Sequence, residues 1–181
     1  MKAIYTLFMC LFLVAFTNAQ ERFLTKNGMI SFFSKSPIEN IKAKNNQVLS
    51  IVDLSKGQMA IAILMKSFMF EKALMQEHFN ENYVESDKYP KATFKGNLLD
   101  FDKITGSETV IAIKGNLTIH GVTKEMTIEA LTKKTAAHIE MTGDFFINLA
   151  DFDVKIPSIV KNNISEKIKV SFRFHHKPYK K

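Results

Sequence analysis

Histidines are the side chains of this sequence best suited to bind a metal or transfer a proton, and there are five. They are His78, His120, His138 and the adjacent pair His175 and His176. No two are spaced one helical turn apart with a glutamate between them, which is the pattern of a zinc-binding helix. On an extended strand, the adjacent pair would point to opposite faces. The sequence therefore predicts no metal site, and we interpret His120 as a hydrogen-bonding residue in a turn.

Nucleophiles and paired acids are the next candidates for chemistry. The only cysteine is Cys10, no serine lies in a G-x-S-x-G motif, and there is no glycine-rich loop that could hold a phosphate. Asp151 and Asp153 would lie on one face of a strand, where two carboxylates could act as general acid and base. They could instead cap turns. These observations favour a protein that is not an enzyme and has neither catalytic residues nor a cofactor.

Flexible and aromatic apolar side chains are abundant in this chain. It has 16 phenylalanines and nine methionines, and no tryptophan. Such side chains repack around ligands of variable shape, so some of them could line a cavity rather than fill a core. Where both faces of a strand are apolar, parity alone leaves open which face is inward. The predicted ligand-binding residues are strand positions of one parity together with two helix residues at one end: Met59, Ile61, Ile63, Met65, Leu74, Phe79, Phe94, Leu98, Ile111, Ile113, Ile139, Met141, Val170 and Phe172.

Strands are predicted to position these residues, because apolar and polar residues alternate along most of the chain. Leu117 and Ile119 alternate with polar residues, and the pattern resumes after a glycine-containing turn. Residues 115–130 are therefore predicted to form a hairpin with its turn at 120–124. The run 59–65 is apolar enough to be buried on both faces. Regular strands in one domain of this size predict an all-β fold, an elongated antiparallel barrel of about eight strands.

One segment, residues 70–80, is predicted to be a short helix instead. It is rich in helix-forming residues and has no glycine or proline. Phe70 and Leu74 would share one face of this helix, while Met75 and Phe79 would lie nearly opposite. A helix that is apolar on two sides packs between two surfaces. We expect these surfaces to be the barrel and a ligand, a loop or a second subunit.

The N-terminus has the layout of a secretory signal peptide over residues 1–19. Lys2 is followed by an apolar run and then by small residues before Gln20. A transmembrane anchor would need about 20 apolar residues, and a lipoprotein would need a small residue before Cys10 instead of Met9. The mature protein is predicted to be one domain, residues 20–181. It has no cysteine, so a hydrophobic core must stabilise it without disulfides.

The formal net charge of the chain is +7, and its lysines are spread along the sequence rather than gathered in one patch. A nucleic-acid-binding protein would need a basic stripe interleaved with aromatic residues, so we expect no nucleic-acid partner. Transient contact with an anionic membrane surface remains compatible with this charge.

Three motifs resemble those of the YceI-like family of bacterial envelope proteins. They are GNLTIHGVTKEMT at 115–127, HFNENYVESDKYPKATFK at 78–95 and NLADFDV at 148–154. Leu149 stands where the family usually has arginine, and Asp153 where it usually has glycine. The resemblance implies a lipocalin-like barrel that holds a lipid or polyisoprenoid and is compatible with a homodimer.

Together these observations predict a periplasmic or secreted binding protein. Its ligand would be a long apolar molecule such as a polyisoprenoid, a quinone or a fatty-acid-like lipid, held inside the barrel. Lysines such as Lys66 or Lys95 could contact a charged head group near the mouth. The alternative is an envelope protein whose own side chains fill the barrel and whose surface binds a partner.

Overall fold

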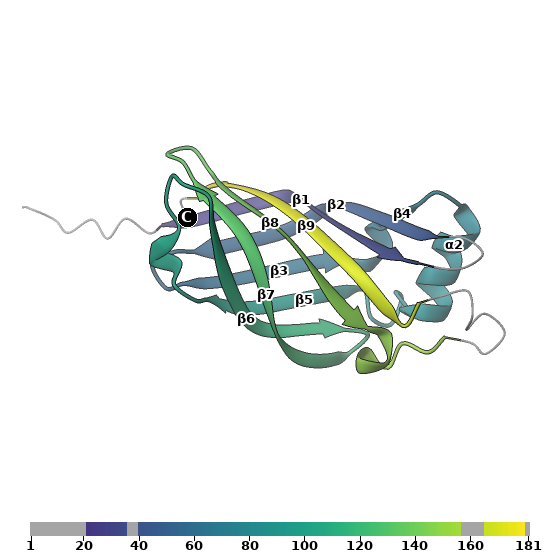
Figure 1. Cartoon of the computed structure of the whole chain (residues 1–181). Helices are drawn as coiled ribbons and strands as arrows, with labels where there is room; N and C mark the ends of the chain where they lie inside the picture. Colours follow the sequence, from purple (N-terminus) through teal and green to yellow (C-terminus); the bar gives the residue numbers. More distant parts are fainter. Residues whose placement is uncertain (1–20, 36–39, 157–164, 180–181) are drawn as a thin grey trace, which may run out of the picture.

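Eight long antiparallel strands form a closed, elongated barrel in the computed structural model, which describes residues 21–35, 40–156 and 165–179 (Figure 1). The strands are hydrogen-bonded in the order β1-β9-β8-β7-β6-β5-β3-β2, and pairing of β1 with β2 closes the barrel. Their bounds are β1 (Arg22–Ser34), β2 (Ile41–Asp53), β3 (Gln58–Leu64), β5 (Lys91–Leu98), β6 (Thr109–Ile119), β7 (Val122–Lys134), β8 (Ile139–Asn148) and β9 (Lys167–Pro178). The predicted all-β barrel of about eight strands is confirmed. The predicted signal peptide lies outside the described residues.

A short helical segment lies across one end of the barrel (Figure 1). The two-residue strand β4 (Met69–Phe70) pairs with β2, and α2 (Ala73–His78) follows and continues as a π-turn over Phe79–Tyr83. The predicted helix over 70–80 thus begins three residues later, because Phe70 is held in the sheet. Shorter 3-10 turns are Met65–Ser67, Phe101–Lys103 and Leu149–Phe152. Among the described residues, no helix is long and apolar enough to cross a membrane.

Strand β3 is buried on one face only, so the prediction that 59–65 is buried on both faces is wrong. Met59, Ile61 and Ile63 are buried inside the barrel, whereas Leu64 is 44% exposed. The outer face of an antiparallel barrel meets water, and small alanines occupy two of the four outward positions of this strand, Ala60 and Ala62. The residues of this run alternate between inward and outward positions, but the sequence does not show it because the outward residues are also apolar.

The hairpin of β6 and β7 is confirmed, but its turn is shorter than predicted. The strands pair from Thr109 to Ile119, and the turn consists of His120 and Gly121 alone. Their φ angles are 51° and 78°, as in the two-residue turns that match the twist of the flanking strands. The predicted turn residues 122–124 belong to β7.

Stacked aromatic rings fill the middle of the barrel and the end opposite α2. The rings of Phe172 and Phe174 on β9 are 5.3 Å apart, and both residues are buried. Each ring lies against a strand glycine: a Cβ on Gly28 would be 2.5 Å from Phe174, and one on Gly143 would be 2.6 Å from Phe172. Glycine is required at these positions because any side chain would displace a ring. This end of the barrel is therefore solidly packed.

Candidate functional site

An apolar cavity of about 540 Å³ occupies the α2 end of the barrel. It lies where β1, β6 and β8 end and where β5 and β9 begin, and the helical segment after β4 covers part of it. Its lining residues are Ile30, Phe32, Ser34, Ile41, Ile63, Met65, Phe68, Phe70, Leu74, Met75, His78, Phe79, Tyr83, Val84, Ala92, Leu117, Ile119, Phe145, Ile147, Leu149, Val154, Ile168 and Val170. The volume lies within the range of about 300–1,000 Å³ typical of small-molecule sites.

Four phenylalanines connect the helical segment to the barrel at this cavity. Phe79 lies 5.5 Å from Phe32, 5.6 Å from Phe68 and 5.0 Å from Phe70, measured between ring centroids. The rings meet in tilted or edge-to-face geometries, which aromatic pairs prefer. These contacts hold the helical segment over the cavity without closing it, because Leu74 lines the cavity and is still 60% exposed.

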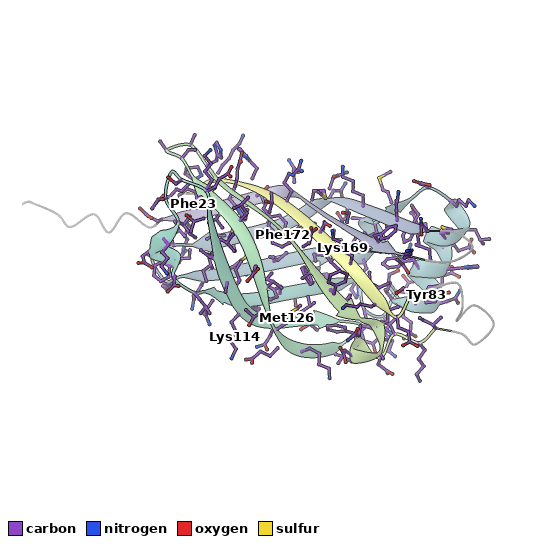
Figure 2. The ribbon with its side chains drawn as sticks, viewed as in Figure 1. Phe23, Tyr83, Lys114, Met126, Lys169 and Phe172 are labelled. Atoms are coloured by element: carbon purple, nitrogen blue, oxygen red, sulfur yellow. The ribbon has the colours of Figure 1, made fainter. Side chains whose placement is uncertain are left out.

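Polar groups in the lining are few. The Ser34 hydroxyl already accepts a hydrogen bond from the backbone N–H of Ser165, at 3.0 Å. His78 and Tyr83 lie in the helical segment, and Figure 2 shows Tyr83 at that end of the molecule. Burial raises the pKa of the Tyr83 phenol above its usual value of 10.0, so this group stays neutral and can donate a hydrogen bond.

No charged side chain of the described residues lines the cavity. Lys66 is paired with Asp87 at 2.5 Å, and Lys95 lies on a shallow surface hollow elsewhere. These two lysines, suggested from the sequence as contacts for a charged head group, are therefore not part of the lining. The cavity suits an uncharged ligand body with a small polar end near His78 and Tyr83.

The structure separates the predicted ligand-binding residues into two groups. Five of them line the cavity: Ile63, Met65, Leu74, Phe79 and Val170. The other nine lie elsewhere, in the packed part of the barrel: Met59, Ile61, Phe94, Leu98, Ile111, Ile113, Ile139, Met141 and Phe172. Alternation along a strand predicts which residues point inward, but it does not tell how far along the barrel a ligand can reach.

Several lining residues were missed by the sequence analysis. Phe145 and Ile147 continue the inward alternation of Ile139 and Met141 on β8, so extending that pattern would have found them. Phe68 lies between elements and Phe70 lies in the two-residue strand β4, where no periodicity marks them. They reach the cavity only because the chain after β3 crosses the open end of the barrel, and the sequence does not show that path.

The predicted carboxylate pair does not form on a strand. Asp151 lies in the 3-10 turn Leu149–Phe152, where one of its carboxylate oxygens is 3.2 Å from Nδ2 of Asn148. Asp153 follows the turn with a φ of 53°. The Asp151 side chain therefore supports a turn, in agreement with the alternative from the sequence, and Asp153 ends this turn through its backbone conformation.

A family model described as the YceI-like domain matches residues 16–176, which is most of the chain. The chain belongs to the YceI-like family. No curated protein gives a significant match.

Solved structures share the barrel of this YceI-like chain. A polyisoprenoid binding domain from Saccharophagus degradans, implicated in plant cell wall breakdown, has a TM-score of 0.77 at 15% identity, covering 88% of this chain and 99% of that one. Burkholderia cenocepacia BcnA has a TM-score of 0.69 at 17% identity, covering 81% and 94%. The Campylobacter jejuni YceI protein has a TM-score of 0.64 at 19% identity, covering 81% of this chain and 90% of that one. The TM-scores establish a shared fold, and identities this low establish nothing beyond the fold.

The YceI-like motifs meet at His120, the residue after the cavity-lining Ile119. Its Nε2 is 2.7 Å from Glu85 Oε2, its Nδ1 is 3.3 Å from the carbonyl oxygen of Phe152, and the Tyr89 ring packs edge-on at 4.5 Å. The hydrogen bond with His120 is the main reason that the pKa of Glu85 is lowered. The interpretation of His120 as a hydrogen-bonding turn residue is confirmed.

The turn beside His120 shows how this YceI-like chain accommodates one departure from the family motif. Asp153 stands where glycine is usual and adopts the left-handed conformation that glycine favours. Aspartate tolerates this conformation better than most residues because its short side chain can hydrogen-bond locally. The turn that carries Phe152 to His120 is therefore compatible with the substitution.

Proposed function

We propose that this protein is a secreted carrier that holds one long apolar chain in the cavity at the α2 end of its barrel. The observation that carries the proposal is the cavity itself, whose lining is apolar apart from Ser34, His78 and Tyr83. An apolar cavity of this size inside an otherwise packed barrel leaves side chains without partners, and a ligand would supply the missing contacts. The polyisoprenoid-binding domain that shares this fold supports an apolar ligand.

The volume limits the length of the chain that fits. At about 30 Å³ for each group the size of a water molecule, 540 Å³ holds about 18 such groups. A fatty chain of about that many carbons, or three to four isoprene units, would fill it. A longer polyisoprenoid would have to leave its end in the open mouth beside Leu74.

The energetics suit a carrier. Burying each methylene group from water contributes about 0.8 kcal/mol. Transfer of the same chain from a membrane changes its free energy much less, because lipid tails are already out of water. Loading and unloading at a membrane would therefore be close to balanced in free energy. Selectivity among ligands would come from the contacts of His78 and Tyr83 with the polar end of the ligand.

Exposed apolar side chains at the mouth support transient contact with a membrane surface. Met69 is 69% exposed on β4, and Leu74, which lines the cavity, is 60% exposed on α2. The signal peptide predicted over residues 1–19 would place the protein in the periplasm or outside the cell.

The alternative is a barrel without a lipid ligand that binds a partner through its surface. The packed end, with its stacked Phe172 and Phe174, is what such a protein would show along its whole length. The open cavity at the other end favours the carrier. A homodimer remains compatible with either function.

Filling the cavity tests the proposal. Ala92 is a buried lining residue on β5, so Ala92→Phe should occupy the space of the ligand while the barrel still folds. Ala112, on the outer face of β6 opposite Glu129, provides the matched control Ala112→Phe. We would measure the shift in melting temperature caused by saturated alcohols of 8 to about 24 carbons.

The expected result is a shift that grows with chain length up to about 18 carbons in the wild type and in Ala112→Phe, and is absent in Ala92→Phe. A carrier function would be contradicted if no chain length shifts the melting temperature of the wild type. It would also be contradicted if the folded Ala92→Phe variant responds as the wild type does.

A further inference from the structure

Two histidines and a glutamate come together on the outer face of the barrel, at the end opposite the cavity. His138 directly precedes β8, Glu140 is two residues further along it, and His175 pairs with Glu140 across the β8–β9 ladder. Residues two apart on a strand, and residues directly opposite on neighbouring strands, share one face of a sheet. All three side chains are partly exposed, so a solvated ion can reach them.

The spacing of the donor atoms fits a metal better than it fits direct hydrogen bonds. Nε2 of His138 is 3.3 Å from Oε1 of Glu140, and Nδ1 of His175 is 3.4 Å from the same oxygen. Charge-assisted hydrogen bonds are shorter, about 2.7–2.9 Å. Ligands about 2.0–2.1 Å from a tetrahedral zinc ion are separated by about 3.3–3.4 Å.

The third distance among the donor atoms, between the His138 and His175 nitrogens, needs only a small adjustment for both to bind one ion. All three donor atoms lie within 4.8 Å of one another. The two imidazole rings are stacked, with centroids 4.1 Å apart and planes at 26°. Rotation of the half-exposed His175 ring would bring its nitrogen closer to that of His138 without moving the backbone.

Thr135 holds His138 in a suitable orientation. Its Oγ1 donates to the carbonyl of His138 and lies 3.1 Å from Nδ1 of the same residue. The same oxygen accepts the backbone N–H groups of Ala137 and His138, so both of its lone pairs are in use. These contacts fix the His138 ring beside Glu140, and metal-binding histidines typically have their other ring nitrogen anchored by a neighbouring group.

We propose that His138, Glu140 and His175 bind one Zn²⁺ ion, with water in the fourth position. Two imidazoles and a carboxylate are ligands that zinc accepts. The sequence shows no sign of this site, because its ligands do not stand at a fixed spacing within one element. They come from β8 and β9 and the residue before β8, and only the register of β8 against β9 brings them together.

Isothermal titration of the tag-free mature protein with ZnCl₂ tests the site. The expected result is one Zn²⁺ per chain, with the affinity weakened at least about tenfold in Glu140→Gln and in His175→Ala. Thr135→Val should weaken the affinity about tenfold through the orientation of His138. His78→Ala is the matched control: it removes a histidine at the cavity end and should bind Zn²⁺ as the wild type does.

Two results would overturn the proposal. One is the absence of Zn²⁺ binding tighter than about 0.1 mM in the wild type. The other is an unchanged stoichiometry and affinity in His175→Ala and Glu140→Gln. Both substitutions are on the outer face, and a melting curve would verify that the variants are folded.

Discussion

At the scale of single residues, His176 links the stability of the barrel to pH. It is fully buried beside Ser50, 2.8 Å from its hydroxyl oxygen. Burial is the main cause that lowers the pKa of His176 from 6.5 to about 4, and a backbone contact with Ile139 opposes it in part. The folded protein thus keeps His176 neutral at pH values where the unfolded chain protonates it.

We predict that His176 makes the folded state less stable as the pH falls from 6.5 to about 4. The unfolded state binds a proton in this window and the folded state does not, so the loss totals about 3 kcal/mol. Above pH 6.5 the histidine does not change the free energy of unfolding with pH, because it is neutral in both states. Urea unfolding at several pH values would measure the effect in the wild type and in His176→Asn, which does not titrate. Equal slopes for the two proteins would contradict the prediction.

Two isoleucines should show where the core ends and the cavity begins. Ile113 is completely buried in the packed part, whereas Ile63 is buried but lines the cavity. We predict that Ile113→Ala lowers the free energy of unfolding by about 2–5 kcal/mol. Ile63→Ala should cost about half as much or less, because fewer contacts are lost, and it should weaken ligand binding. Chemical denaturation and ligand titration would measure both quantities. A larger stability loss in Ile63→Ala would show that this site is packed core.

The sequence predicted which residues point inward better than it predicted which of them line a cavity. Ile63 and Ile113 have the same inward alternation, and nothing local distinguishes them. The difference arises from stacked rings such as Phe172 and Phe174 against glycines on other strands, which close one end. The site of His138, Glu140 and His175 was hidden for a related reason, because it depends on strand register.

At the scale of elements, the turn between β6 and β7 should be sensitive to substitution. Gly121 has a φ of 78°, and a Cβ there would be 2.7 Å from the Tyr89 ring. We predict that Gly121→Ala lowers the free energy of unfolding by about 1–3 kcal/mol, from backbone strain and displacement of Tyr89. Gly106→Ala is the matched control, since a Cβ there would meet only one atom, at 3.8 Å. Equal unfolding free energies for the two variants would contradict this account of the turn.

Most elements followed from the sequence, and the exceptions have physical reasons. Alternation predicted the hairpin, but it could not show that His120 adopts a positive φ and so shortens the turn. The run 59–65 looked buried on both sides because alanines are apolar even where they face water. The helix was expected from Phe70, yet pairing of β4 with β2 delays it to Ala73.

At the scale of the whole molecule, the barrel has two unlike ends. One end is packed with aromatic rings and carries the histidine and glutamate cluster on its outer face. The other end is open beneath the helical segment and lined with apolar side chains. The sequence has a single cysteine and so cannot form an intrachain disulfide. This division explains how one YceI-like fold can be stable without one and still leave space for a ligand.

The central claim is that this space holds a long apolar chain, and native mass spectrometry of the gently purified mature protein tests it most directly. The account predicts a folded protein carrying a discrete added mass, released by organic solvent and identified as a single-chain lipid. The Ala92→Phe variant, purified in parallel, should carry no added mass. Wild-type protein found only at its own mass, together with a solvent extract free of lipid, would contradict the account.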